Sequence, residues 1–284
     1  MRSSQPRRQN PLNKETMLKK IIGIAAPARS GKDTVAAMLL QHKQVAAYAL
    51  ADPLKIGCQA LFGLSDAETW NDSLKEHSLP LWGKSPRQFF QQVGTDWMRT
   101  HNPDHWLLRS ERSINTPDKD ILPRDPPSLD YAKAPFKMAA QAFFDLSAAQ
   151  TWDSTLADTP VPFWGMSPGQ MFALLEALAL KDFPDYVSRR AQRALAPPSR
   201  EIPTLGDSEI IIIKDIRFEN EAEFLRRHNG KIWHIVRKTA EKVNAHTSEL
   251  GIAIAAEDVL IYNDGTLEEL AYAVEKAWEN LNTI

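Results

Sequence analysis

Near the start of the chain lies a short segment whose residue types suit the binding of phosphate. It reads Ala26-Pro27-Ala28-Arg29-Ser30-Gly31-Lys32-Asp33-Thr34, with an apolar run at 21–25 before it and a helical stretch at 34–40 after it. The order strand, loop, helix directs free backbone N–H groups and the positive end of the helix dipole at one point. Lys32 adds a positive charge suited to the β- and γ-phosphates of a nucleotide. The segment therefore predicts a phosphate-binding loop.

Two residues of this loop differ from the usual Gly-x-x-x-x-Gly-Lys-[Ser/Thr] pattern. Ala26 stands where the first glycine is expected, and Asp33 stands where a hydroxyl normally supplies an oxygen to Mg²⁺. The Asp33 carboxylate is itself a suitable oxygen ligand for Mg²⁺, directly or through water. A Cβ at Ala26 is unfavourable if the backbone there needs a positive φ. The alternative interpretation is a plain strand-to-helix turn with a solvated arginine and lysine.

Further charged residues follow later strands. The apolar run 209–214 is typical of a strand buried on both faces, and it leads into Asp215 and Arg217. An aspartate at the tip of such a strand suits Mg²⁺ or its water shell, and Arg217 suits a phosphate. The alternative is that Asp215 only caps a following helix. Asp52 and Lys55 follow an expected strand, which is where ligands bind in open α/β sheets, although an exposed loop pair would look the same.

The elements expected around these residues alternate between strands and helices. Strands are expected at 21–25, 45–50, 209–214, 231–236 and 258–262, and helices at 34–40, 219–228 and 266–279. This alternation, with the phosphate loop after the first strand, predicts an α/β fold of the P-loop NTPase type. We expect a doubly wound five-stranded parallel sheet with helices on both faces, formed by a core of residues 17–55 and 208–284.

Composition limits the class of protein. The 284 residues are 43% hydrophobic and 25% charged, which is ordinary for a soluble globular chain. A net charge of −2 provides no broad basic field for nucleic acid, and no apolar run is long enough to span a bilayer. The single cysteine, Cys58, excludes an internal disulfide and fits a reducing cytoplasm. We therefore expect a cytoplasmic protein whose partners are small molecules, with residues 1–16 as a disordered extension.

The region between the second and third expected strands contains an internal repeat. Residues 64–70 recur as 146–152, and residues 80–86 recur as 162–168, with paired tryptophans in both segments. The repeat continues after a one-residue slip, so that 103–105 matches 184–186. We expect a first copy at 56–115, a Pro-rich linker at 116–129 and a second copy at 130–196, inserted over the carboxyl edge of the sheet.

The two copies differ in their polar residues. Ser-Pro predicts a helix start at Ser85 and at Ser167. Gln92 and Arg99 fall on one face of the first helix, a face suited to a polar ligand. The second copy keeps the apolar positions and loses polar ones, so we expect the first to bind substrate and the second to be structural. A helical spacer with no site in either copy is the alternative. If relatives pair through this region, the second copy could replace a partner and leave a monomer; otherwise a homodimer is expected.

An ordered series of segments resembles the deoxynucleoside monophosphate kinases of tailed bacteriophages. The resemblance covers about 18–112 and 208–281, whereas the second copy and the N-terminal extension have no counterpart, and Ala26 replaces the usual glycine. The segments that carry it are Ser30-Gly31-Lys32-Asp33-Thr34, Leu50-Ala51-Asp52-Pro53-Leu54-Lys55, Gly94-Thr95-Asp96, Lys214-Asp215-Ile216-Arg217, His234-Ile235-Val236-Arg237, His246-Thr247-Ser248-Glu249 and Asn263-Asp264-Gly265-Thr266-Leu267-Glu268-Glu269-Leu270.

The resemblance implies transfer of the γ-phosphoryl group of ATP to a deoxynucleoside 5′-monophosphate, giving ADP and a deoxynucleoside diphosphate. It implies that Mg²⁺ is organised by Asp33 and Asp215, and that the catalytic side chains are Lys32, Asp215, Arg217 and Arg237. The residues implied for ATP are Arg29, Ser30, Gly31, Lys32, Asp33, Thr34, Asn263 and Gly265. The residues implied for the acceptor nucleotide are Asp52, Lys55, Arg87, Gln92, Asp96, Arg99, His246 and Glu249.

Three other functions are compatible with the same sequence. A kinase of another small phosphorylated acceptor, such as dephospho-coenzyme A or phosphomevalonate, would share the loop and the sheet. A non-catalytic nucleotide-binding module would bind ATP without producing acceptor-dependent ADP. A scaffold that uses the repeat to bind a partner in a replication complex would keep its function without Lys32.

Overall fold

The structure is a computed structural model that describes residues 19–27, 29–115, 133–194, 205, 208–238 and 252–282. The extension expected at 1–16, the linker expected at 116–129, and the site candidates His246 and Glu249 lie outside these residues. No helix in the described ranges is long and apolar enough to cross a membrane.

Five parallel strands form the sheet, as the sequence predicts. They are β1 (Lys20–Ala25), β2 (Val45–Ala49), β3 (Ile210–Ile216), β4 (Lys231–Val236) and β5 (Val259–Tyr262), in the spatial order β2-β3-β1-β4-β5. The chain crosses from β2 on one edge to β5 on the other with β1 in the middle. The fold class is therefore a doubly wound α/β sheet.

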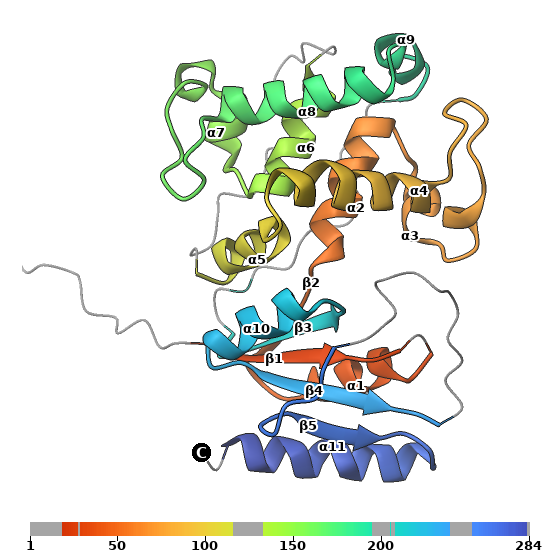
Figure 1. The fold of residues 1–284 in the computed structure, drawn as a ribbon, viewed down its shortest axis with the longest axis vertical. Helices are drawn as coiled ribbons and strands as arrows, with labels where there is room; N and C mark the ends of the chain where they lie inside the picture. The colour runs from red at the N-terminus through yellow and green to blue at the C-terminus, as the bar shows by residue number, and fades with distance from the viewer. Residues whose placement is uncertain are drawn as a thin grey trace, which may run out of the picture.

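Helices cover both faces of this sheet. Alternate residues of a strand point to opposite faces, so Ile22 packs with α1 (Lys32–Leu39) and α11 (Leu267–Asn282), whereas Ile21 packs on the other side with α10 (Glu219–Arg227). Figure 1 shows α11 and α10 on opposite sides of the strands. Burial on both faces explains why the central strands are almost continuously apolar.

The region between β2 and β3 folds into two helical units with the same order of elements. The first helical unit contains α2 (Ala51–Phe62), α3 (Asp66–Trp70), the 3₁₀ turn η1 (Leu74–Glu76), α4 (Pro86–Gln91), the π-helix η2 (Gln92–Arg99) and α5 (His105–Asn115). The second helical unit contains α6 (Ala134–Phe144), α7 (Ala148–Trp152), the 3₁₀ turn η3 (Ser154–Leu156), α8 (Pro168–Asp182) and α9 (Tyr186–Arg190). Both units lie on the α10 side of the sheet (Figure 1).

Local interactions also match between the units. Ser85 and Ser167 each form a capping box at the helix start that the sequence predicts. The indole Nε1 of Trp82 donates to the carbonyl of Phe62 at 3.0 Å, and that of Trp164 donates to the carbonyl of Phe144 at 2.7 Å. The sequence offset in both comparisons is the same. The two units therefore share their packing as well as their order of elements.

One helix of the first unit departs from the regular geometry expected for it. The helix that begins at Ser85 continues as a π-helix over Gln92–Arg99, whereas α8 is α-helical throughout. A π-helical turn accommodates one residue more than an α-helical turn. The π-helix thus explains the one-residue slip between the two sequence copies, and it lies in the copy that carries the candidate site residues.

A buried histidine at the start of α5 predicts acid sensitivity. His105 is 1% exposed, and burial, assisted by the nearby Arg109 guanidinium, lowers its pKa to about 3. Between pH 6.5 and about 3 the unfolded chain binds a proton that the folded chain excludes, so stability falls as the pH falls through that window. We expect the free energy of unfolding from urea titrations to fall by up to about 1.4 kcal/mol per pH unit between about pH 6 and 5.

The matched variant is His105→Gln, which cannot be protonated in this range. It should lose most of the slope that the wild-type chain shows in the same interval, where most carboxylates stay ionised. An equal slope in both chains would assign the acid sensitivity to other groups.

Candidate functional site

All five strands direct candidate residues to one edge of the sheet. Because the strands are parallel, their carboxyl ends lie together, which is where open α/β sheets bind ligands. The segments that follow or end the strands there are the phosphate loop after β1, Asp52 after β2, Asp215 at the end of β3, Arg237 after β4 and Asn263 after β5. The topology therefore brings together residues that are far apart in the sequence.

The phosphate loop is held in shape by its own backbone and by β5. Gly31 has a φ of 96° and is the N-cap of α1, a conformation that favours glycine. Ser30 is buried, and its hydroxyl donates to the carbonyl of Pro27 at 2.7 Å. Among the described residues no side chain caps the first turn of α1. Its N–H groups are thus directed at the loop interior, as an anion site requires.

Asn263 anchors the loop from the other end of the chain. Its Nδ2 donates to the carbonyl of Ser30 at 2.8 Å, and a Cβ at Gly31 would lie 2.3 Å from the same nitrogen. Arg237 lies beside the same loop, with Nη1 donating to the carbonyl of Arg29 at 3.5 Å. The structure therefore brings Asn263 and Arg237 to the loop, whereas Gly265 lies in the turn that precedes α11.

Loss of the Asn263 anchor should weaken nucleotide binding. Asn263→Ala removes one neutral hydrogen bond, worth about 0.5–1.5 kcal/mol, so we expect the KM for ATP to rise about 2–10-fold with a small change in kcat. Asn263→Asp keeps the size but sets a carboxylate against the Ser30 carbonyl, so it should raise the KM at least as much. Steady-state kinetics measure both effects, and an unchanged KM in both variants would show that the loop keeps its shape without the anchor.

Asp215 occupies a β-bulge. Along β1 and β3, Ile24 pairs with Lys214 and Ala25 pairs with Ile216, so Asp215 is the extra residue between them. Its φ of 70° is rare for a residue with a side chain, and such outliers concentrate at functional sites. Asp215 also forms an ion pair with Arg217. The bulge turns the carboxylate away from the regular direction of the strand.

The helix that follows β3 is capped by a different residue. The carboxylate of Glu221 accepts from the backbone N–H of Arg217 at 2.8 Å and from that of Phe218 at 3.2 Å. The alternative in which Asp215 serves only as the helix cap is therefore wrong, because Glu221 performs that role.

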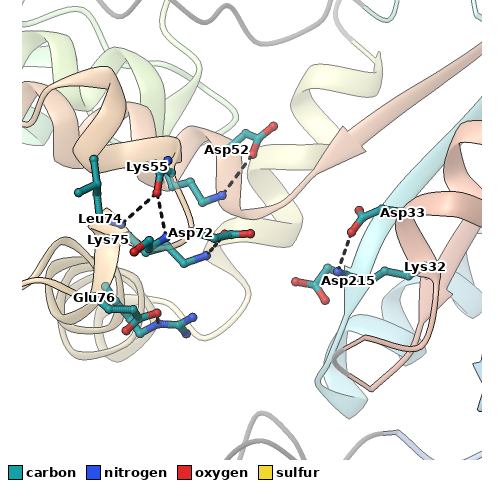
Figure 2. Close-up of polar contacts among 12 residues, drawn as sticks. Lys32, Asp33, Asp52, Lys55, Asp72, Leu74, Lys75, Glu76 and Asp215 are labelled. Atoms are coloured by element: carbon teal, nitrogen blue, oxygen red, sulfur yellow. Dashed lines mark hydrogen bonds and ion pairs between the residues drawn. The ribbon is translucent and has the colours of Figure 1, made fainter. Parts of the chain in front are cut away.

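Two carboxylates are available for a divalent cation at this edge. Asp33 is 76% exposed and lies 3.3 Å from the ammonium of Lys32, and Figure 2 shows both on the same side of the view as Asp215. No cluster of three His, Cys, Asp or Glu side chains suited to a metal occurs in the described part of the chain. One or two carboxylates completed by phosphate oxygens and water is the donor set that Mg²⁺ takes. The residues present thus fit Mg²⁺ in combination with a nucleotide.

The start of α2 lies across from the phosphate loop. Asp52 lies in the first turn of α2 and Lys55 in the next, with the ammonium 4.0 Å from the carboxylate and 4.8 Å from the centre of the Trp70 ring. Figure 2 shows this pair, with the turn at 72–76, on the side opposite Lys32, Asp33 and Asp215. In that view the two groups of side chains lie apart, one on the first helical unit and one at the edge of the sheet.

The other acceptor candidates are in separate places. Arg87 forms an ion pair with Glu76, and Asp96 is exposed on the π-helix. Gln92 donates to the carboxylate of Asp182 in the second helical unit and accepts from Lys84 at 2.6 Å. The structure brings neither Arg87 nor Gln92 into contact with the phosphate loop, and their role in acceptor binding stays a prediction.

Arg99 connects the helical units to the core. It forms an ion pair with Glu221, whose side chain is 4% exposed, and its guanidinium lies 4.2 Å from the centre of the Phe218 ring. Glu221 thus holds both the turn after Asp215 and the candidate acceptor helix. In the sequence it appears only as a glutamate in the first turn of a helix, so pattern alone does not identify this link.

Comparisons with known proteins point to one family. The profile described as "Deoxynucleotide monophosphate kinase" matches residues 201–274, from the approach to β3 into α11. The deoxynucleotide monophosphate kinase of Escherichia phage RB69 is 36% identical over 71 residues, which are 25% of this chain and 29% of that protein. That of Enterobacteria phage T4 is 36% identical over 59 residues, 21% of this chain and 24% of that protein.

A third relative is matched over a longer stretch. The putative deoxynucleotide monophosphate kinase of Acanthamoeba polyphaga mimivirus is 26% identical over 143 residues, 48% of this chain and 74% of that protein. The chain thus matches less than a third of the length of the two phage relatives but most of the mimivirus protein.

Proposed function

Because the chain resembles the deoxynucleotide monophosphate kinases of phages and of mimivirus, we propose that it transfers the γ-phosphoryl group of ATP to a deoxynucleoside 5′-monophosphate. The products are ADP and a deoxynucleoside diphosphate. The observation that carries the proposal is the convergence of the phosphate loop, the bulged Asp215 with Arg217, and Arg237 at one edge of the sheet. The proposed place of action is the cytoplasm, with small nucleotides as partners.

On the donor side, the loop and Lys32 hold the phosphates of ATP. The N–H groups at the start of α1 bind the phosphate oxygens, and the Lys32 ammonium compensates negative charge on the β- and γ-phosphates. Arg29, Ser30, Gly31 and Thr34 complete this surface, and Asn263 fixes the loop through Ser30. Asp33 and Asp215 would hold Mg²⁺, which when bound neutralises charge on the phosphate oxygens.

Phosphoryl transfer needs little covalent assistance from the protein. The transition state is loose, with charge spread over the equatorial oxygens of the transferred group. Arg217, oriented by its ion pair with Asp215, and Arg237, beside the loop, supply positive charge at that point. The acceptor phosphate is already ionised near neutral pH, so the reaction requires no strong general base.

On the acceptor side, the first helical unit supplies the residues. Lys55 near the start of α2 is proposed to meet the acceptor phosphate, and its ion pair with Asp52 supports this by orienting the ammonium. Arg99 contributes through its contact with the turn after Asp215. Arg87, Gln92, Asp96, His246 and Glu249 are proposed as further acceptor-binding residues on the basis of the resemblance.

The test is ADP release from Mg·ATP with each of the four deoxynucleoside monophosphates supplied in turn. Dephospho-coenzyme A and phosphomevalonate serve as comparison acceptors. Turnover that depends on one or more deoxynucleotides, and not on the comparison acceptors, supports the proposal and identifies the base preferred. Turnover with a comparison acceptor alone would indicate another small-molecule kinase. ATP binding without acceptor-dependent ADP would indicate a nucleotide-binding module.

A further inference from the structure

The two helical units contact each other through matched pairs of residues. In the sequence repeat, residues 60–63 align with residues 142–145, and the same offset holds up to Ser85 and Ser167. After the one-residue slip, the alignment pairs His105 with Tyr186, Arg109 with Arg190, and Arg112 with Arg193. The three residues of the first unit belong to α5. Those of the second unit belong to α9, except Arg193, which follows the end of α9. Equivalent positions can therefore be compared across the interface.

The arginines at equivalent positions make the same contact in opposite directions. Arg109 in the first helical unit donates from Nε to the carbonyl of Ala142 in the second, at 2.7 Å. Arg190 in the second unit donates from Nε to the carbonyl of Ala60 in the first, at 3.1 Å. Ala60 and Ala142 are equivalent in the repeat. Both arginines are buried. Each unit thus gives and receives the same buried interaction.

A second pair of contacts repeats this exchange one helical turn further on. Arg112 donates from Nε to the carbonyl of Asp145 at 3.2 Å, and Arg193 donates from Nε to the carbonyl of Gly63 at 2.9 Å. Gly63 and Asp145 are the residues that end α2 and α6, and both have left-handed backbones, with φ of 64° and 55°. The left-handed backbone of the residue that accepts the hydrogen bond is therefore the same in both units.

A third pair involves residues of different type. The Tyr186 hydroxyl donates to the carbonyl of Leu61 at 2.6 Å, and its ring centre lies 5.8 Å from that of Trp82. The equivalent His105 ring lies 5.2 Å from that of Trp164, which is the residue equivalent to Trp82. Between these contacts α2 packs along α6, and a Cβ at Gly57 would lie 2.0 Å from the Phe143 ring. Reciprocal use of one surface by both partners is the defining property of a two-fold interface between identical subunits.

We infer that the second helical unit occupies, within one chain, the place that a second copy of the first unit would take in a two-fold dimer. The two-fold face of the first unit is already covered by α6 and α9. We therefore expect the chain to be a monomer in which the second helical unit replaces a partner subunit. This inference does not depend on the chemistry that the chain performs.

The mass of the full-length chain in solution tests the inference directly. Size-exclusion chromatography with light scattering, over micromolar to submillimolar concentrations, should give 32.0 kDa throughout. Twice that mass at any concentration in the range would overturn the inference, because the chain would then bind a partner subunit in addition to its second helical unit.

Variants at equivalent positions test the reciprocity. Arg109→Met and Arg190→Met each remove one of the two matched contacts, so both should lower the midpoint of thermal unfolding by more than about 4 °C. Arg227→Met, at an exposed position on α10, is the control and should shift the midpoint by less than about 1 °C. An unchanged midpoint for Arg190→Met would overturn the inference, since the second unit would then contribute nothing by that contact.

A milder variant covers the case in which a buried arginine cannot be replaced without misfolding. Tyr186→Phe removes only the hydroxyl that donates to Leu61 and keeps the ring. It should lower the midpoint by about 2–4 °C while the mass stays that of a monomer. No shift in this variant, together with a dimeric mass of the wild-type chain, would show that the second unit is an appendage and not a substitute subunit.

Discussion

Lys32→Ala should reduce acceptor-dependent ADP release by about 10²–10³-fold, because it removes a preorganised charge from the phosphates on which negative charge changes during transfer. Lys32 is the first residue of α1, 24% exposed and with Asp33 as its ionic neighbour, so its removal leaves the apolar core of the fold intact. The thermal midpoint should therefore stay within a few degrees of wild type. Lys43→Ala, at an exposed position after α1, is the control and should retain full activity.

The result also distinguishes the proposed kinase from the alternative functions. A Lys32→Ala chain that keeps more than about half of the wild-type rate would show that this loop does not hold the transferring phosphate. If instead ADP release is absent in the wild-type chain, and binding of a protein partner survives the substitution, the scaffold interpretation would be favoured.

Arg217→Ala should lower kcat by about 10³-fold or more, with a smaller change in the KM for ATP. Arg217 is 43% exposed, and its guanidinium is oriented by the carboxylate of the bulged Asp215. A charge held in that position acts mainly on the transition state, so its loss appears in kcat. The variant should still bind ATP, as measured by calorimetry.

Two further substitutions make this prediction sharper. Arg217→Lys keeps the charge but loses the planar fork, so it should recover only part of the rate. Arg227→Ala removes an exposed arginine from α10 of the same core and should have no effect. A rise in the KM for ATP with kcat unchanged in Arg217→Ala would place Arg217 in ground-state binding and not in catalysis.

The parts of the fold that depend on local sequence could be predicted. The run at Ile210–Ile213 predicts a strand buried on both faces because it is short, apolar and β-branched, and Lys231–Val236 has the bounds expected from its pattern. Ser85 and Ser167 begin their helices because the serine hydroxyl accepts from a first-turn N–H and proline at the next position needs no N–H partner. The phosphate loop and Asp215 could be placed at one edge because parallel strands share their carboxyl ends.

The rest depends on contacts between distant residues. A single residue inserted between Lys214 and Ile216 turns Asp215 into a left-handed backbone, and no sequence pattern marks such a bulge. The π-helix follows from one additional residue within a regular apolar stripe. The ion pair of Arg99 with Glu221 joins residues 122 positions apart. An arginine expected to face a ligand therefore also connects the first helical unit to the core.

The reciprocal interface has a genetic consequence. In a dimer of identical subunits every substitution appears on both sides of the axis, so a residue that suits one side must be tolerated on the other. Here the two sides are encoded separately, and each can change alone. Asp182 of α8 illustrates this freedom: it accepts from the indole Nε1 of Trp97 at 2.7 Å and from Gln92, and so supports the π-helix of the first unit. A chain that carries its own partner can thus let one half specialise as support for the other.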